Sequence, residues 1–270
     1  MKITVDGIEI EALEGQTIYE AAEAAGIEIP TLCHTPGLEP VGVCRMCVVD
    51  VGERAKAAAC VRECQPNMVV TTNSEELEGH RKMLTDLLMS DQPTPEAGDR
   101  REVALGDNEL LALSRRYDAT GEPFRTGAAP LARGIDDSSK VIDVDHQACI
   151  LCDRCIRACN DVQNNEVLGR SGKGHASRIA FDLDQPMGES TCVSCGECAA
   201  ACPTGALVDK AIGLPLRPRA ELEPVDSVCP YCGVGCGVLA GPEGMIKGDP
   251  DHPANFGRLC SKGAALGETI

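Results

Sequence analysis

The chain has 270 residues and 17 cysteines, but no Trp and only three Tyr and three Phe. So little aromatic material leaves a weak conventional core, and we expect several small modules stabilised by metal centres. The formal net charge of -17 argues against nucleic acid as a partner. The chain start carries neither a signal peptide nor a twin-arginine segment, and no later run approaches a membrane span. We therefore expect a cytoplasmic protein without a membrane span.

The chain begins with a pattern typical of a hairpin followed by a helix. Apolar residues alternate over residues 2–10, and the pair Asp6 and Gly7 interrupts them, which predicts a two-residue hairpin turn. Thr17 and Glu20 then have the spacing of a capping box, so a helix is expected to begin there.

Four cysteines follow this helix, between expected strands at residues 46–51 and 69–72. They suit a [2Fe-2S] cluster, although their spacing departs from the plant type. Over roughly residues 1–75 the pattern resembles the N-terminal ferredoxin-like domain of the complex I large iron-sulfur subunit, iron-only hydrogenases and cytoplasmic formate dehydrogenases, which implies a β-grasp domain at residues 1–76. Cys64 is left over as a buried thiol or an alternative ligand, and we favour the buried thiol. The expected ligands are Cys33, Cys44, Cys47 and Cys60.

A helical connector is expected at residues 77–138. Helices are predicted over residues 74–90, from leucines at helical spacing, and around 109–117, and the Gly- and Pro-rich stretch at 121–139 is expected to connect them to the next module. His80 on the first of these helices is interpreted as a surface histidine. The leucines are Leu77, Leu84, Leu87 and Leu88.

In the families named above, such a helix leads into a His-Pro-x-x-Cys motif that binds a further [4Fe-4S] cluster. Here Gln92 stands in the position of the His and Glu96 in the position of the first Cys. No cysteine occurs between Cys64 and Cys149. We therefore predict that this cluster is absent.

Two cysteine runs with identical spacing form the centre of the chain. A thiolate at every third residue, with a fourth three residues further on, wraps the backbone around one cubane and offers the last sulfur to a second one. The runs therefore predict two [4Fe-4S] clusters with exchanged fourth ligands. Structural zinc usually takes two separated Cys pairs, and disulfides do not persist in a reducing cytosol, so both alternatives are disfavoured. One set is Cys149, Cys152, Cys155 and Cys202, and the other is Cys192, Cys195, Cys198 and Cys159.

Each run is preceded by a short alternating strand, at residues 141–144 and 179–183, which indicates an internal repeat. Residues 138–210 resemble the bacterial two-cluster ferredoxin, and a domain of this type is expected at residues 139–212. The glycines and lysine of residues 169–174 match no phosphate-binding fingerprint in order, so a plain loop is expected there.

A stiff Pro-containing linker is expected at residues 213–225, before a last module at residues 226–270. Four cysteines in this module suffice for zinc as well as for a cluster. The residues around them resemble the N-terminal [4Fe-4S] domain of molybdopterin oxidoreductases, which implies a third cubane. In that family a lysine two positions after the last Cys lies between cluster and pterin, and Lys262 holds this position as a possible electron relay. The expected ligands are Cys229, Cys232, Cys236 and Cys260.

The expected fold class is thus α+β and multidomain, with one [2Fe-2S] and three [4Fe-4S] clusters arranged as an electron wire. The cluster order most resembles the N-terminal part of a cytoplasmic, NAD-linked formate dehydrogenase α subunit. That resemblance implies a flavin- and NAD-binding diaphorase partner, and molybdopterin with Mo or W on residues outside this chain or on a catalytic partner. Relatives continue for several hundred residues, so a fragment or a separately encoded catalytic subunit is expected.

Two alternatives stay open for the function. Residues 248–270 look closer to assimilatory nitrate reductases, which favours a different substrate. A free-standing polyferredoxin-like carrier is the other alternative, although a carrier has no pterin for Lys262 to face. No acid–base pair, nucleophile or other catalytic residue is visible.

Overall fold

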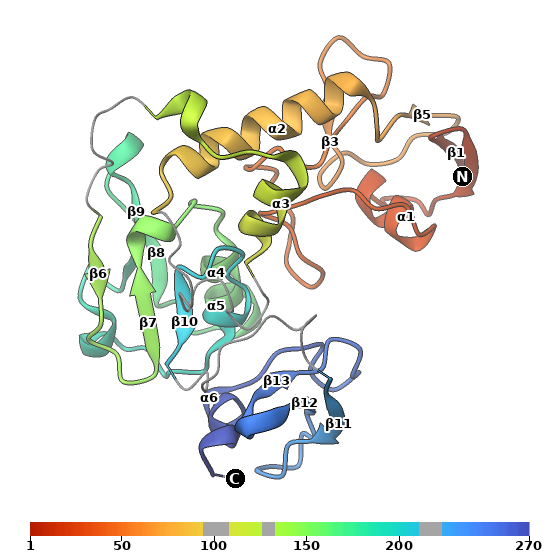
Figure 1. Cartoon of the computed structure of the whole chain (residues 1–270). Coiled ribbons are helices and arrows are strands. Elements are labelled where there is room, and N and C mark those ends of the chain that lie inside the picture. Colours follow the sequence, from red (N-terminus) through yellow and green to blue (C-terminus); the bar gives the residue numbers. More distant parts are fainter. Residues whose placement is uncertain (94–107, 126–132, 211–222, 270) are drawn as a thin grey trace. The chain divides into compact units, whose positions relative to one another are not determined.

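The protein is described by a computed structural model that covers residues 1–93, 108–125, 133–210 and 223–269. It divides into two compact units, described separately below. The mixture of short helices and small sheets agrees with the predicted α+β, multidomain class (Figure 1). Unit 1 comprises Met1–Ser90 with Ala112–Thr126, and unit 2 comprises Asp91–Leu111 with Gly127–Ile270.

The predicted hairpin opens unit 1. Strands β1 and β2 pair antiparallel with Val5 opposite Ile8. Asp6 and Gly7 between them have φ angles of 50° and 82°, as a two-residue turn with left-handed backbone requires. A third strand, β5, pairs parallel to β1 and completes a three-stranded sheet. The strands are β1 Lys2–Val5, β2 Ile8–Glu11 and β5 Val69–Val70.

The predicted capping box is also confirmed. Helix α1 spans Ile18–Ala24, and the Thr17 hydroxyl accepts the Glu20 amide while the Glu20 carboxylate accepts the Thr17 amide at 2.8 Å. Two backbone donors at the helix start are thereby satisfied. Ile18 and its neighbours on α1 enter the apolar core below the sheet.

A two-stranded sheet, β3 Val48–Val49 with β4 Ala57–Ala58, follows the first cysteines. The strand predicted over residues 46–51 is thus shorter than expected. The carbonyls of Met46 and Val48 accept hydrogen bonds from the guanidinium of Arg81 on the next helix, so a longer ladder is not formed there.

That next helix, α2 Glu75–Ser90, confirms the helix predicted over residues 74–90. Its buried face differs from the predicted leucine stripe, because Leu87 is 45% exposed whereas Leu77, Arg81 and Met89 are buried. His80 is exposed, as predicted.

Arg81 is the unexpected member of this face, with 2% exposure. Its guanidinium also donates to the Thr72 carbonyl at 2.8 Å and pairs with Glu78 at 2.5 Å. A buried cation with carbonyl and carboxylate partners joins α2 to the strands of unit 1.

The second predicted helix is α3, which spans Glu109–Tyr117 as expected. The connector predicted over residues 121–139 contains more structure than a plain linker. It includes a 3-10 helix at Glu122–Phe124 and strand β6 at Ile135–Asp136, while residues 126–132 lie outside the described ranges.

The centre of unit 2 is a three-stranded antiparallel sheet of order β10-β7-β6 with a separate β8–β9 hairpin (Figure 1). Its apolar core includes Ile142, Phe181 and Leu207 together with cysteine side chains from both repeats. The remaining strands are β7 Ile142–Asp145, β8 Leu168–Ser171, β9 Arg178–Phe181 and β10 Leu207–Asp209. The helices are α4 Arg154–Arg157, α5 Glu197–Ala200, a π-helix at Ala158–Val162 and 3-10 turns at His146–Ala148, Gly174–Ala176 and Met187–Glu189.

The plain loop predicted at residues 169–174 is wrong. The first residues of this stretch belong to β8, and the chain then turns back into β9. Gly172 has φ 78°, and a Cβ there would lie 2.6 Å from the Ala176 carbonyl oxygen. The glycines therefore serve a tight hairpin connection.

The last module has its own antiparallel sheet of order β11-β12-β13. The proline run predicted as a linker lies outside the described residues. None of the described helices is both long and apolar enough to cross a membrane. The elements are β11 Val225–Val228, β12 Gly237–Ala240, β13 Ile246–Gly248, α6 Ser261–Ala264 and 3-10 turns at Pro242–Gly244 and Ala265–Thr269.

Candidate iron–sulfur cluster sites

The four cysteines predicted for the [2Fe-2S] cluster converge in unit 1. The Sγ atoms of Cys47 and Cys60 are 3.4 Å apart, and the Cys33 amide donates to Cys44 Sγ at 3.3 Å. The Met46 amide donates to the same sulfur at 3.5 Å. Such amide donors stabilise thiolate ligands.

Their proximity couples the ionisation of these thiols. Hydrogen bonds from Cys44 and Cys60 hold the pKa of Cys33 well below its ordinary value. The same contact with Cys33, followed by burial, raises the pKa of Cys44. Neighbouring thiolates repel one another, so all four ionise together only where a cation compensates them. Iron supplies that charge when bound, and the donor set fits it.

Cys64 lies apart in character. It is buried in the apolar core, and burial raises the pKa of its thiol. Its backbone amide donates to the Gln16 carbonyl at 2.9 Å. These surroundings support the buried-thiol interpretation over the alternative-ligand one.

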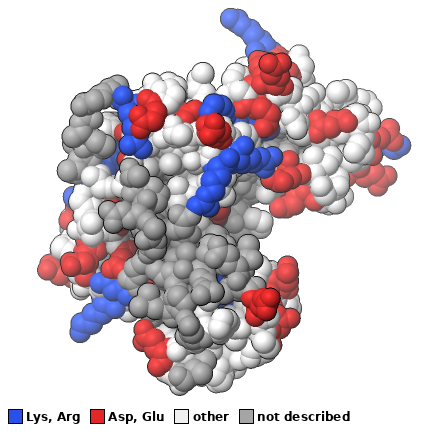
Figure 2. Space-filling model, in the orientation of Figure 1, with Lys and Arg blue, Asp and Glu red and all other residues white. Residues whose placement is uncertain are grey.

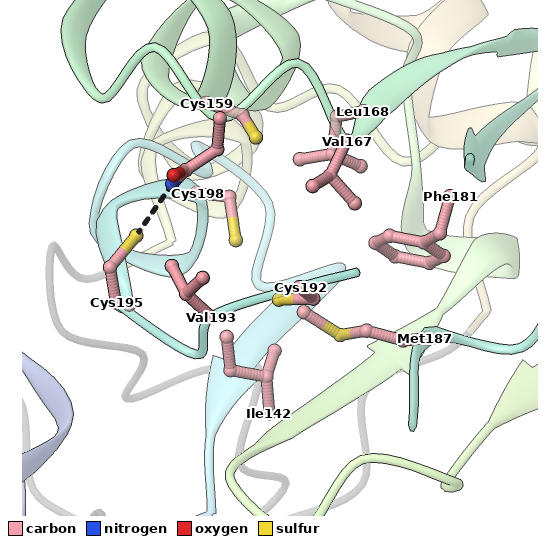
Figure 3. Close-up of a pocket in the computed structure, with 12 residues that line it drawn as sticks. Ile142, Cys159, Val167, Leu168, Phe181, Met187, Cys192, Val193, Cys195 and Cys198 are labelled. Atoms are coloured by element: carbon pink, nitrogen blue, oxygen red, sulfur yellow. Dashed lines mark hydrogen bonds between the residues drawn. The ribbon is translucent and has the colours of Figure 1, made fainter. Parts of the chain in front are cut away.

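In unit 2, one cavity of about 340 Å³ is lined by four cysteines from both halves of the repeat (Figure 3). Cys159 comes from the first run, while the other three come from the second run around α5. The remaining walls are apolar and include Val167, Phe181 and Met187. The four cysteines are Cys159, Cys192, Cys195 and Cys198.

A second cavity of about 310 Å³ is lined by the complementary set. Cys202 here comes from the second run and the other three from the first. Burial raises the pKa values of Cys155 and Cys198 well above the ordinary value, so these thiols need a compensating cation to serve as thiolate ligands. The structure thus brings together both predicted sets; cluster ligation itself stays a prediction. The second set is Cys149, Cys152, Cys155 and Cys202.

Equivalent backbone turns hold the first sulfur of each run. The Leu151 amide donates to Cys149 Sγ, and the Ser194 amide donates to Cys192 Sγ, both at 3.4 Å. Leu151 and Ser194 have φ angles of 56° and 55°. Left-handed backbone is uncommon for residues other than glycine, and here it aims an amide at each sulfur.

Two side chains that the motif does not contain also reach cysteine sulfurs. The Asn165 Nδ2 atom lies 3.9 Å from Cys195 Sγ and donates to it (Figure 3). The Thr204 hydroxyl lies 3.7 Å from Cys202 Sγ. Neither residue was predicted, because a polar residue outside the cysteine spacing carries no sequence signal for such a contact.

Asn165 is expected to raise the reduction potential of the cluster held by Cys195. A donor to sulfur stabilises the more negative, reduced state. One weak hydrogen bond corresponds to roughly 40 mV, so Asn165→Ala should lower one cubane potential by a few tens of millivolts in an EPR-monitored titration. Asn164→Gly is the matched control, because Asn164 is exposed and its φ of 52° suits glycine. Equal potentials in both variants would contradict the expectation.

The last module presents its four cysteines more openly. Cys229 is buried, whereas Cys232 and Cys260 are exposed. Burial, and then the charges of these three thiols, raises the pKa of Cys236, which shows that the four lie near one another. They fit the predicted third cubane as a donor set.

Asn255 fixes the loop that leads to the last of these cysteines. Its side chain accepts the Gly237 amide at 2.7 Å and donates to the Gly237 carbonyl at 3.0 Å and the Arg258 carbonyl at 2.8 Å. Because Gly237 directly follows Cys236, this buried amide joins both ligand segments. Lys262 is exposed on α6, and its role toward a pterin stays a prediction.

Gln92 stands where relatives of the first module carry a cluster histidine. It is buried, and its amide donates to the Ala148 carbonyl at 3.2 Å, directly before Cys149. The side chain is therefore used as a structural link. Glu96 lies outside the described residues.

Three family models match the chain in this order. Residues 1–75 match a 2Fe-2S iron-sulfur cluster binding domain, and residues 148–206 match a 4Fe-4S dicluster domain. Residues 222–270 match a molybdopterin oxidoreductase Fe4S4 domain. The kinds of cluster site predicted from the sequence are thereby supported for all three modules.

A chain from the crystal structure of an NAD+-reducing [NiFe]-hydrogenase superposes with a TM-score of 0.69 and 32% identity. The match covers 80% of our chain and 90% of that chain. Our chain belongs to this iron–sulfur family. The family also includes an NADH-quinone oxidoreductase component of Rhizobium meliloti, 32% identical over 97% of our chain and 31% of its own length.

A more distant relative, a putative formate dehydrogenase of Staphylococcus haemolyticus, is 24% identical over 97% of our chain and 30% of its own length. The chain thus spans about a third of the length of the curated relatives it matches. The resemblance predicted between the first module and the complex I subunit is consistent with these matches.

Proposed function

We propose that this chain is the electron-relay region of a nicotinamide-linked oxidoreductase. It would carry electrons through one [2Fe-2S] and three [4Fe-4S] clusters, between a flavin- and NAD-binding partner and a catalytic site outside the described residues. The observation that carries the proposal is the pair of cavities in unit 2, each lined by four thiols drawn from both halves of the repeat. The names of the hydrogenase and quinone oxidoreductase relatives support the nicotinamide link.

The chemistry of the last module supports a catalytic partner that holds molybdopterin. Its Fe4S4 domain is of the molybdopterin oxidoreductase type, and two of its cysteines are exposed toward a prospective neighbour. Formate is our first candidate for the substrate, from the cluster order and the formate dehydrogenase relative. Nitrate is the second candidate, because residues 248–270 resemble assimilatory nitrate reductases.

The surface charge favours a partner with a basic docking face. The chain has 42 Asp and Glu against 25 Lys and Arg, and acidic side chains are scattered over the face shown in Figure 2. Complementary charge accelerates association and is screened by salt. Reduction by a diaphorase partner should therefore slow as ionic strength rises.

Metal analysis of protein purified anaerobically from its own host tests the proposal. The assigned clusters predict about 14 irons per chain, with near-stoichiometric Mo or W in the assembly. The bound clusters should bleach with NADH through the diaphorase partner, and with formate if formate is the substrate. Full iron without Mo or W would favour a free carrier, and clusters oxidised by nitrate but not reduced by formate would favour the second candidate.

A further inference from the structure

The two halves of the dicluster module carry opposite charges at one equivalent position. Residues 152–155 of the first half correspond to residues 195–198 of the second, with a cysteine at each end. The third position is Arg154 in the first half and Glu197 in the second, and each begins a short helix. They are 5% and 9% exposed. Burying either charge is costly unless a partner compensates it.

Each buried charge has its partner in a different flanking segment. Arg154 Nη1 lies 2.8 Å from a carboxylate oxygen of Glu109, the first residue of α3. Glu197 Oε1 lies 3.0 Å from Nε of Arg258, in the loop before Cys260. The first half is thus paired with the segment that precedes the module, and the second half with the module that follows it.

The neighbouring position differs between the halves in the same sense. Gly196 has φ 83°, and a Cβ on it would lie 3.3 Å from the Leu259 carbonyl oxygen. Its equivalent, Asp153, has a similar φ of 62° but carries a side chain that pairs with Arg170 at 2.7 Å. The half without a side chain is the one that the backbone next to Cys260 approaches.

We propose that Arg154 and Glu197 are docking residues of opposite sign that decide which half of the repeat receives which flanking segment. Glu197, with Gly196 beside it, positions the last module through Arg258, so that the third cubane neighbours the cubane of the second run. Docking on the first half would place Arg258 against Arg154, and like charges disfavour that arrangement. The inference rests on the electron relay proposed above and names the contact across which electrons leave the dicluster module.

Charge reversal in the full chain tests this inference. Glu197→Arg and Arg258→Glu should each abolish the magnetic interaction between the two neighbouring reduced cubanes in EPR, and the double variant should restore it. Arginine at position 197 is compatible with cluster binding, because Arg154 occupies the equivalent position. Arg258 lies outside the dicluster motif altogether. Iron per chain should stay at the wild-type value in all three variants.

Arg170→Glu is the matched control, because it reverses a pair of the same kind beside the first cubane. It should leave the interaction with the third cubane unchanged. The docking inference is overturned if wild-type protein with full iron shows no interaction, if Arg258→Glu preserves it, or if the double variant fails to restore it. Wild-type protein that lacks the cubane signals would instead overturn the relay itself.

Discussion

Replacing both Cys149 and Cys202 by alanine is expected to remove one cubane, whereas replacing both Cys192 and Cys202 is expected to remove two. The reason is the exchange of fourth ligands between the halves, visible in the cysteines that line each cavity. The first double variant should lose about four irons and the second about eight. Iron analysis with EPR spin quantification after anaerobic purification measures the difference.

The [2Fe-2S] signal is the internal control for both double variants, because its cysteines belong to unit 1. Its intensity should match the wild type. Loss of about eight irons from the first pair, or of about four from the second, would mean that each run binds its own cubane without exchange.

Replacing Arg81 by methionine is expected to lower the free energy of unfolding of unit 1 by roughly 3–5 kcal/mol. Methionine keeps the helix propensity and much of the volume, but it leaves the carbonyls of Met46, Val48 and Thr72 without their guanidinium donor. Denaturant titration followed by the visible circular dichroism of the [2Fe-2S] chromophore measures the change.

His80→Met is the control for this substitution, because His80 lies on the same helix but is exposed. A surface change of this kind should stay within about 0.5 kcal/mol. If both variants unfold at the same denaturant concentration, the buried guanidinium contributes little to stability.

Features set by neighbours in sequence were predictable. The turn at Asp6 and Gly7 and the capping box at Thr17 depend on residues within three positions of one another. The grouping of cysteines was predictable for a related reason, since the spacing of a run limits which sulfurs can surround one cubane.

Features set by distant partners were missed. Arg81 would be read as a solvent-exposed helix residue, because the carbonyls that bury it come from strands and loops earlier in the chain. Strand β8 and the sheet of the last module were missed as well, since short strands rich in glycine lack an alternating pattern. The amides of Leu151 and Ser194 reach sulfur through left-handed backbone that their side chains do not favour.

The exchange of ligands has a consequence for biosynthesis. During translation Cys149, Cys152 and Cys155 leave the ribosome well before Cys202, so the first cavity has no fourth wall until the second run is made. Closing that long loop costs chain entropy, which the hairpin β8–β9 lowers by drawing the two runs together. The assembly machinery therefore meets two incomplete sites that become competent at the same moment. Cluster insertion into this module should be an all-or-none event that follows synthesis of both halves.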